Sequence, residues 1–306
     1  MAVSFELSRM TKTYDYRRFL TGVLGKGWMI YEVTYIAFIV LVLSVLGSAA
    51  GLLAKDAFGF SETTGVVLMM IAVGALVFYG SALIEKVLAF WSLGLYAIYI
   101  IFLIASFSIF GDQIASNVGA SKPDASWFVD GVRYAAYNIG IVPAVLFCLR
   151  HVETRREALS AGLLAGPIAM IPALLFYFAM LGHYPAVLNE AVPVNFLLGK
   201  MNLPILQLGF QIILLGTFVE TGTGFIHGLN ERIAGAYEEH KKIMPGFLRA
   251  AIAIVALVVS IYIASAIGLV NLIGKGYGTI TWAFLLVFVL PVLTIGVWKI
   301  ARRKDG

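Results

Sequence analysis

Eight apolar segments dominate the chain, and each is close to the roughly 20 residues that an α-helix needs to cross a lipid bilayer. They span residues 28–54, 65–87, 88–110, 127–149, 159–181, 203–229, 247–269 and 280–300. Only 13% of the 306 residues are charged, whereas about 25% is usual in soluble domains. The sequence therefore predicts an all-α polytopic membrane protein with eight transmembrane helices in a single transmembrane domain, residues 1–306.

The distribution of basic residues predicts the orientation in the membrane, because short cytoplasmic loops are rich in Lys and Arg. With the N-terminus in the cytoplasm, most of the 22 Lys and Arg residues fall on the cytoplasmic side. The exceptions, on the outer side, are Lys55, Lys122, Arg133, Lys200 and Lys275. An even number of spans then places both termini in the cytoplasm.

The sequence lacks the residue patterns that mark enzymes, metal sites and nucleic-acid partners. The four His residues are widely scattered, and the sequence has no zinc-protease, nucleophile-elbow or phosphate-loop motif. The single Cys148 excludes an internal disulfide and a Cys-based metal site. The net charge of +5 is dispersed between apolar spans. We therefore expect no enzyme, no metal, no cofactor and no nucleic-acid partner. The bilayer is the expected partner, and the oligomeric state stays open.

The span 127–149 carries three residues that weaken helical hydrogen bonding, namely Asn138, Gly140 and Pro143. Asn138 lies roughly 16 Å along the helix from Trp127, near the middle of a hydrocarbon core of about 30 Å. Broken backbone at that depth is tolerated only where protein buries it or where it lines a wet cavity. The sequence therefore predicts an interrupted helix halfway across the membrane.

Transporters use such discontinuous helices to bind substrate near the midplane. We therefore predict that Tyr134, Tyr137, Asn138 and Gly140 form a substrate-binding site. The alternative is a Pro-kinked helix with a packing role only, because Pro and Gly are common in membrane helices. Asp130 and Arg133, at the outer end of this span, are spaced to form an i, i+3 ion pair. The Trp and Tyr residues near span ends are predicted to be interface anchors.

The span 203–229 has the densest set of polar residues inside the predicted membrane, and polar groups are costly there. Glu220, Thr223 and His227 share one helical face, and Thr221 is adjacent. One interpretation is a proton- or cation-coupling site formed by Glu220, Thr221, Thr223 and His227. The other is an acid bonded to a Thr or an Arg that holds neighbouring helices together.

Two blocks of sequence, residues 134–150 and 220–232, resemble the YkvI-type membrane proteins. The first begins Tyr-Ala-Ala-Tyr-Asn-Ile-Gly-Ile-Val-Pro, and the second reads Glu-Thr-Gly-Thr-Gly-Phe-Ile-His-Gly-Leu-Asn-Glu-Arg. That family is placed with the amino acid–polyamine–organocation transporters of the LeuT-like fold. The resemblance implies an inverted-repeat bundle of two five-helix repeats, whose broken first and sixth helices face each other across the substrate site.

In that pattern the span 127–149 corresponds to the sixth helix, with Tyr137, Asn138 and Gly140 in its unwound segment. The span 203–229 corresponds to the eighth helix, where Thr221 and Thr223 are the nearest candidates for hydroxyl ligands of a sodium ion.

The N-terminal half is short compared with the LeuT-like pattern. Residues 127–300 supply a complete five-helix second repeat, whereas residues 28–110 supply an incomplete first repeat. Residues 1–27 are expected to be a cytoplasmic helix tail and connection. Because the first helix and most of the second have no counterpart, we expect the chain to be a fragment rather than a shortened protein.

These features together predict a secondary active transporter of a small polar or amino-acid-like solute, coupled to Na⁺ or H⁺. Its expected location is the bacterial inner (plasma) membrane. A fragment would carry half of the binding site and could be non-functional. The alternative is a non-transporting membrane scaffold or sensor protein, for which an incomplete repeat is less of a handicap.

Overall fold

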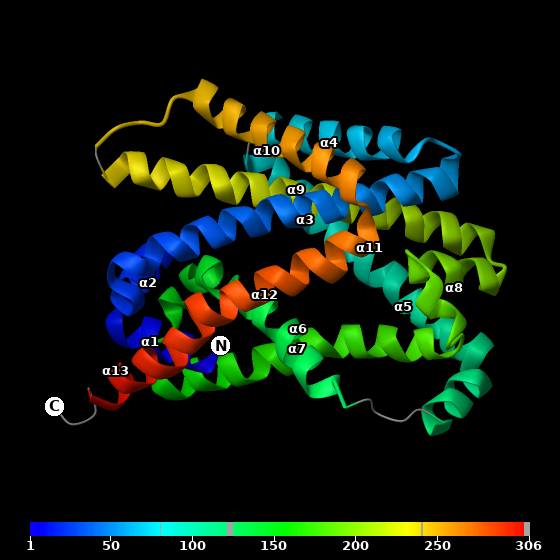
Figure 1. Ribbon diagram of the computed structural model, residues 1–306, viewed down its shortest axis with the longest axis horizontal. Coiled ribbons are helices and arrows are strands. Elements are labelled where there is room, and N and C mark those ends of the chain that lie inside the picture. Colours follow the sequence, from blue (N-terminus) through cyan, green and yellow to red (C-terminus); the bar gives the residue numbers. More distant parts are fainter. Residues whose placement is uncertain (80, 121–124, 240, 303–306) are drawn as a thin grey trace. The chain divides into compact units, whose positions relative to one another are not determined.

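The computed structural model describes residues 1–79, 81–120, 125–239 and 241–302, which form helices and connections without a β-strand (Figure 1). Six of these helical stretches are long and apolar enough to cross a membrane, and a bent pair of helices makes up to seven. The six are Tyr16–Phe58, Trp91–Gly119, Arg155–Leu181, Pro204–Glu238, Gly246–Ile267 and Leu269–Arg302. The prediction of an all-helical, multi-pass membrane protein is confirmed.

The second predicted span, residues 65–87, includes residue 80 and so lies partly outside the described residues. Helix α4 covers Glu62–Tyr79 and helix α5 covers Ser81–Ala120, with residue 80 outside the described part. The apolar stretch of α4 is shorter than the six long spans. The backbone of α5 leaves the helical conformation at Phe110, which is where the predicted third span ends.

The helices group into two compact units, each assembled from separate parts of the chain. The first unit contains Met1–Phe38, Lys122–Leu175 and Lys275–Gly306. Its elements are α1 (Ala2–Thr11), α2 (Tyr16–Leu24), η1 (Gly25–Gly27), the start of α3 (Trp28–Phe58), α6 (Trp127–Ile139), η2 (Val142–His151), most of α7 (Arg155–Leu181), α12 (Gly278–Phe284), η5 (Leu285–Val289), η6 (Val292–Gly296) and α13 (Val297–Arg302).

The second unit contains Ile39–Ser121 and Phe176–Gly274. Besides the rest of α3 and α7, it has α4, α5, η3 (Ala186–Asn189), α8 (Pro193–Met201), α9 (Pro204–Glu239), α10 (Gly246–Ile267), α11 (Leu269–Asn271) and the first half of the π-helical turn η4 (Leu272–Tyr277), whose second half belongs to the first unit. A core of Phe and Leu side chains packs between α5, α8 and α9, with Phe102 in ring contact with Phe176 and Phe210.

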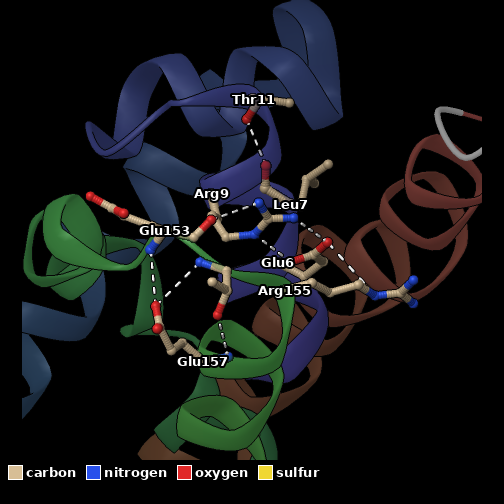
Figure 2. Close-up of polar contacts among 8 residues, drawn as sticks. Glu6, Leu7, Arg9, Thr11, Glu153, Arg155 and Glu157 are labelled. Atoms are coloured by element: carbon tan, nitrogen blue, oxygen red, sulfur yellow. Dashed lines mark hydrogen bonds and ion pairs between the residues drawn. The ribbon is translucent and has the colours of Figure 1, made fainter. Parts of the chain in front are cut away.

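Helix α1 is held in the first unit by a buried charge. The Glu6 side chain is only 4% exposed and accepts hydrogen bonds from Nε and Nη2 of Arg9 at 2.8 and 2.7 Å. Arg155 approaches the same carboxylate at 3.9 Å, and Arg9 also donates to the Glu153 carbonyl at 3.1 Å (Figure 2). These contacts join α1 to the connection between η2 and α7, so the predicted helix tail is an integral part of this unit.

Helices α5 and α9 of the second unit approach closely at Gly216. The Trp91 indole of α5 lies against that glycine and donates from Nε1 to the Ile213 carbonyl at 2.9 Å. A Cβ atom at Gly216 would lie only 1.9 Å from Cζ2 of Trp91. The absence of a side chain at this position is therefore what lets the indole reach the backbone of α9.

We predict that Gly216→Ala lowers the free energy of unfolding by about 1–3 kcal/mol, because the added methyl group displaces the indole. Gly224→Ala, on the same helix, is the matched control, since a Cβ there meets no atom within 4 Å. The control should keep or raise stability, by up to about 1 kcal/mol from helix propensity. Thermal unfolding in detergent micelles measures both variants. Equal stability of the two would contradict the close approach.

Candidate functional site at the interrupted helix

The predicted interruption in residues 127–149 is present. Helix α6 ends at Ile139, η2 begins at Val142, and the two are bent by 60°. Pro143 lies in the first turn of η2, where its missing N–H is tolerated. The 3₁₀ segment runs for 10 residues, whereas runs beyond 3–4 residues are uncommon. The interruption thus extends from the bend to the end of the span.

The bend changes the hydrogen bonding of one peptide carbonyl in particular, that of Gly140. In a continuous α-helix the Ala144 N–H would donate to this carbonyl. In η2 the Ala144 N–H instead donates to Ile141 at 2.9 Å. The Tyr31 hydroxyl replaces it and donates to the Gly140 carbonyl oxygen at 2.8 Å in a buried position. A side chain from α3 therefore satisfies a backbone group that the interruption has released.

Glycine is required at position 140 by a close approach from α12. A Cβ atom there would lie 2.4 Å from Cγ and 2.6 Å from Cδ1 of Phe284. The ring is fully buried and has no room to move aside without disturbing its neighbours. Gly140 thus combines two roles, because it accepts the Tyr31 hydroxyl and admits the Phe284 ring.

An aromatic cluster, defined here as Tyr31, Tyr35, Phe38, Phe284 and Phe288, surrounds this hydrogen bond. Tyr31 is 0% exposed and stacks on Tyr35 with ring centroids 5.9 Å apart. Its ring also lies 6.0 Å from Phe284 and 5.9 Å from Phe288. The cluster fixes the Tyr31 ring and thereby aims its hydroxyl at the bend. Tyr31 lies near the start of the first predicted span, and its ring is buried in this unit.

The predicted substrate-binding tyrosines lie one turn before the bend. Tyr137 is half-buried and stacks on Tyr277, with centroids 4.9 Å apart and planes inclined by 15°. Tyr134 is exposed and contacts Tyr137 edge-on at 5.4 Å. Tyr277 was not predicted, because it lies some 140 residues further along the chain and belongs to no local motif.

Asn138 is exposed, as a ligand-binding residue would be, but its amide already has a partner. Its Nδ2 donates to the Tyr134 carbonyl at 2.7 Å, one turn back in the same helix. The amide must leave this carbonyl before it can donate to a solute. The structure therefore brings Tyr134, Tyr137 and Gly140 together near the bend and holds Asn138 in a local bond.

The N-terminal half of α6 is attached to α12 by polar contacts. The Thr281 hydroxyl donates to the Arg133 carbonyl at 3.2 Å, and the Arg133 guanidinium lies over the Trp282 ring at 5.6 Å. Arg133 and Asp130 are 3.4 Å apart, so the predicted ion pair is present. Both are largely exposed, and such a pair contributes little stability.

The predicted ion-coupling residues all belong to α9 in the second unit, but they differ in burial and in hydrogen-bond partners. Glu220 is half-buried, and its Oε1 accepts a long hydrogen bond of 3.4 Å from Ser92 of α5. Thr221 is also half-buried. Thr223 is fully buried and donates its hydroxyl to the Val219 carbonyl at 2.7 Å, so its proton is used within the helix.

His227, the fourth predicted coupling residue, lines a separate cavity of about 370 Å³ nearer the end of α9. It lies roughly 10 Å along the helix from Glu220. Within the described parts of the chain, no group of three or more His, Cys, Asp or Glu side chains could hold a metal ion. The oxygen atoms of Glu220 and Thr221 are hard ligands, of the kind that small hard cations prefer.

Comparison with known proteins gives no match to a family model, to a curated protein or to a solved structure. The resemblance to the YkvI-type membrane proteins therefore stays a prediction from the two sequence blocks. The function of the site is therefore inferred from its own geometry.

We predict that Tyr31→Phe lowers the free energy of unfolding by about 1–3 kcal/mol, because it leaves the buried Gly140 carbonyl without a donor. Tyr262→Phe is the control, since it removes the same hydroxyl from a ring that is 74% exposed. Unfolding in detergent micelles should separate the two variants clearly. If Tyr31→Phe unfolds like the wild type, the hydroxyl is not what satisfies the bend.

Proposed function

We propose that this protein is a secondary active transporter that binds a small polar or amino-acid-like solute at the α6–η2 bend. The single observation that carries the proposal is the 60° interruption of an apolar span, with a backbone carbonyl met by a buried tyrosine hydroxyl. Peptide groups released inside a membrane need polar neighbours. A segment that supplies such neighbours can exchange them for a polar solute.

The side chains at the bend indicate a solute without net charge. Tyr134, Tyr137, Tyr277 and Asn138 provide hydroxyl and amide groups, and no Asp, Glu, Lys or Arg is among them. Hydroxyls and amides can both donate and accept hydrogen bonds. The stacked Tyr137 and Tyr277 rings add a flat apolar surface. A neutral or zwitterionic molecule with a small apolar part fits this chemistry best.

The proposed binding step exchanges internal hydrogen bonds for bonds to the solute. Asn138 releases the Tyr134 carbonyl, and the freed amide and carbonyl both become available to the solute. Each exchange replaces one hydrogen bond by another, so the cost is small and a bound state is accessible.

Glu220 is the proposed coupling residue, with Thr221, Thr223 and His227 as its candidate neighbours. Among the described residues Glu220 makes no ion pair, and its one hydrogen bond comes from the neutral Ser92. A charged carboxylate inside a membrane is costly without a compensating charge. Binding of H⁺ or Na⁺ would supply that charge, which is the basis for proposing either ion as the driving ion.

The proposal also covers the architecture and the family. We propose eight spans, a LeuT-like bundle with an incomplete first repeat, and a relationship to the YkvI-type proteins. The proposal also comprises a location in the bacterial inner membrane with both termini in the cytoplasm. The supporting observations are the interrupted span and the bias of Lys and Arg between the two sides.

A non-transporting membrane scaffold or sensor is the second candidate, and two contacts favour it. The Asn138 amide and the Thr223 hydroxyl both bond within their own helices. In a purely structural protein these bonds would be permanent. A transporter has to break at least the first of them in each cycle.

Uptake into proteoliposomes, measured with labelled neutral L-amino acids under Na⁺ and pH gradients, tests the proposal. We expect gradient-driven uptake of at least one of them. Asn138→Ala should lower the rate about fivefold, as loss of a neutral hydrogen bond implies. Glu220→Gln should abolish the dependence on the ion gradient. Asn189→Ala and Glu190→Gln, at exposed positions between α7 and α8, are the matched controls.

Absence of uptake of every amino acid under both gradients would favour the scaffold or sensor. A wild-type rate in Asn138→Ala would remove this residue from the site. Unchanged ion dependence in Glu220→Gln would leave that carboxylate with a packing role.

A further inference from the structure

A polar cavity lies within the second unit, at the end of α9. It has a volume of about 370 Å³ and is lined by His227, Asn230 and Glu231 of α9, Gly246, Arg249 and Ala250 of α10, and Val77 and Phe78 of α4. Helices α4, α9 and α10 pack against one another in this unit (Figure 1). The volume lies within the range of small-molecule sites.

Asn230 is the unusual residue in this cavity. It is only 3% exposed, and its Oδ1 is buried without a hydrogen-bond partner among the described residues. Buried amide oxygens are nearly always bonded, and an unbonded one costs stability. An apolar residue would serve packing better at this position. The oxygen is therefore suited to accept a hydrogen bond from a molecule that enters the cavity.

Among the described residues, the charged groups of the cavity form one pair of opposite sign. Arg249 donates to Glu231 at 2.6 Å, and their side chains are 40% and 52% exposed. An ion pair with that exposure is weak, so a ligand can compete for both partners. Glu231 lies next to Asn230 on α9, whereas Arg249 lies in the first turn of α10. That first turn carries the partial positive charge of a helix N-terminus.

The cavity thus has two halves of different chemistry. Asn230 Oδ1 and the Glu231 carboxylate accept hydrogen bonds and attract a cation. Arg249 and the start of α10 attract an anion. We propose that this cavity binds a small zwitterion, with its ammonium group at Asn230 and Glu231 and its carboxylate at Arg249. The site is independent of the α6–η2 bend and does not rest on the proposed transport function.

Binding to the purified protein, measured by calorimetry in detergent micelles, tests this inference. The probes are L-alanine, ethylammonium, which lacks the carboxylate of alanine, and propionate, which lacks its ammonium group. We expect saturable binding of alanine, with each single-charge probe binding at least about tenfold more weakly. Glu231→Gln and Arg249→Gln should each weaken alanine binding about tenfold, as loss of a charged hydrogen bond implies.

Asn230→Leu gives a readout that a packing role would not produce. We expect it to abolish alanine binding while the ligand-free protein unfolds at the same or a higher temperature, because an unbonded buried oxygen has been removed. Glu62→Gln is the matched control, since Glu62 forms an exposed ion pair with Lys55 elsewhere in the same unit. Alanine binding should be unchanged in it.

Asn138→Ala separates this site from the proposed transport site. Alanine binding that persists in Asn138→Ala and is lost in Glu231→Gln supports the second site, whether or not transport is found. Alanine binding that is lost in Asn138→Ala and persists in Glu231→Gln would overturn the second site and support the transport site. Equal affinity for ethylammonium and alanine, or no alanine binding by any form of the protein, would also overturn it.

Discussion

The hydrogen bond from Tyr31 to the Gly140 carbonyl is the contact on which the architecture of the first unit depends. Lipid cannot hydrate a peptide group, so a helix that bends by 60° within an apolar span needs an internal partner for each released carbonyl. Here the partner is a hydroxyl at 2.8 Å, aimed by the aromatic cluster, whose Phe284 ring fits only because position 140 has no side chain. Without this bond, the bend would leave a buried acceptor unsatisfied.

The interruption itself could be predicted from the sequence, because its causes are local. Asn138, Gly140 and Pro143 weaken helical hydrogen bonding whatever surrounds them, and they lie in a segment whose length and apolarity define a span. The partners of the bend could not be predicted in the same way. Tyr31 and Phe284 lie more than 100 residues away along the chain, and only tertiary packing brings them to Gly140. A tyrosine near a span end has the same sequence pattern whether it is buried or interfacial.

For the polar residues of α9 too, the sequence predicts the local arrangement but not the tertiary partners. The shared face of Glu220, Thr223 and His227 follows from helical periodicity. What each side chain bonds to does not follow from it. Thr223 donates to its own helix, and His227 lines a cavity that also includes Arg249 of α10. Helix boundaries set a similar limit, since the third predicted span ends at Phe110, whereas helix α5 runs on to Ala120.

The central claim is that the interrupted helix borders a polar, water-accessible space. The most direct test is thiol labelling of Asn138→Cys in a Cys148→Ser background, because the native Cys148 is exposed. Ile168→Cys, on an exposed apolar face of α7, is the reference for a lipid-facing position. In sealed proteoliposomes a charged, membrane-impermeant reagent should modify position 138 and leave position 168 unmodified. Modification of position 138 by lipid-soluble reagents alone would contradict the claim.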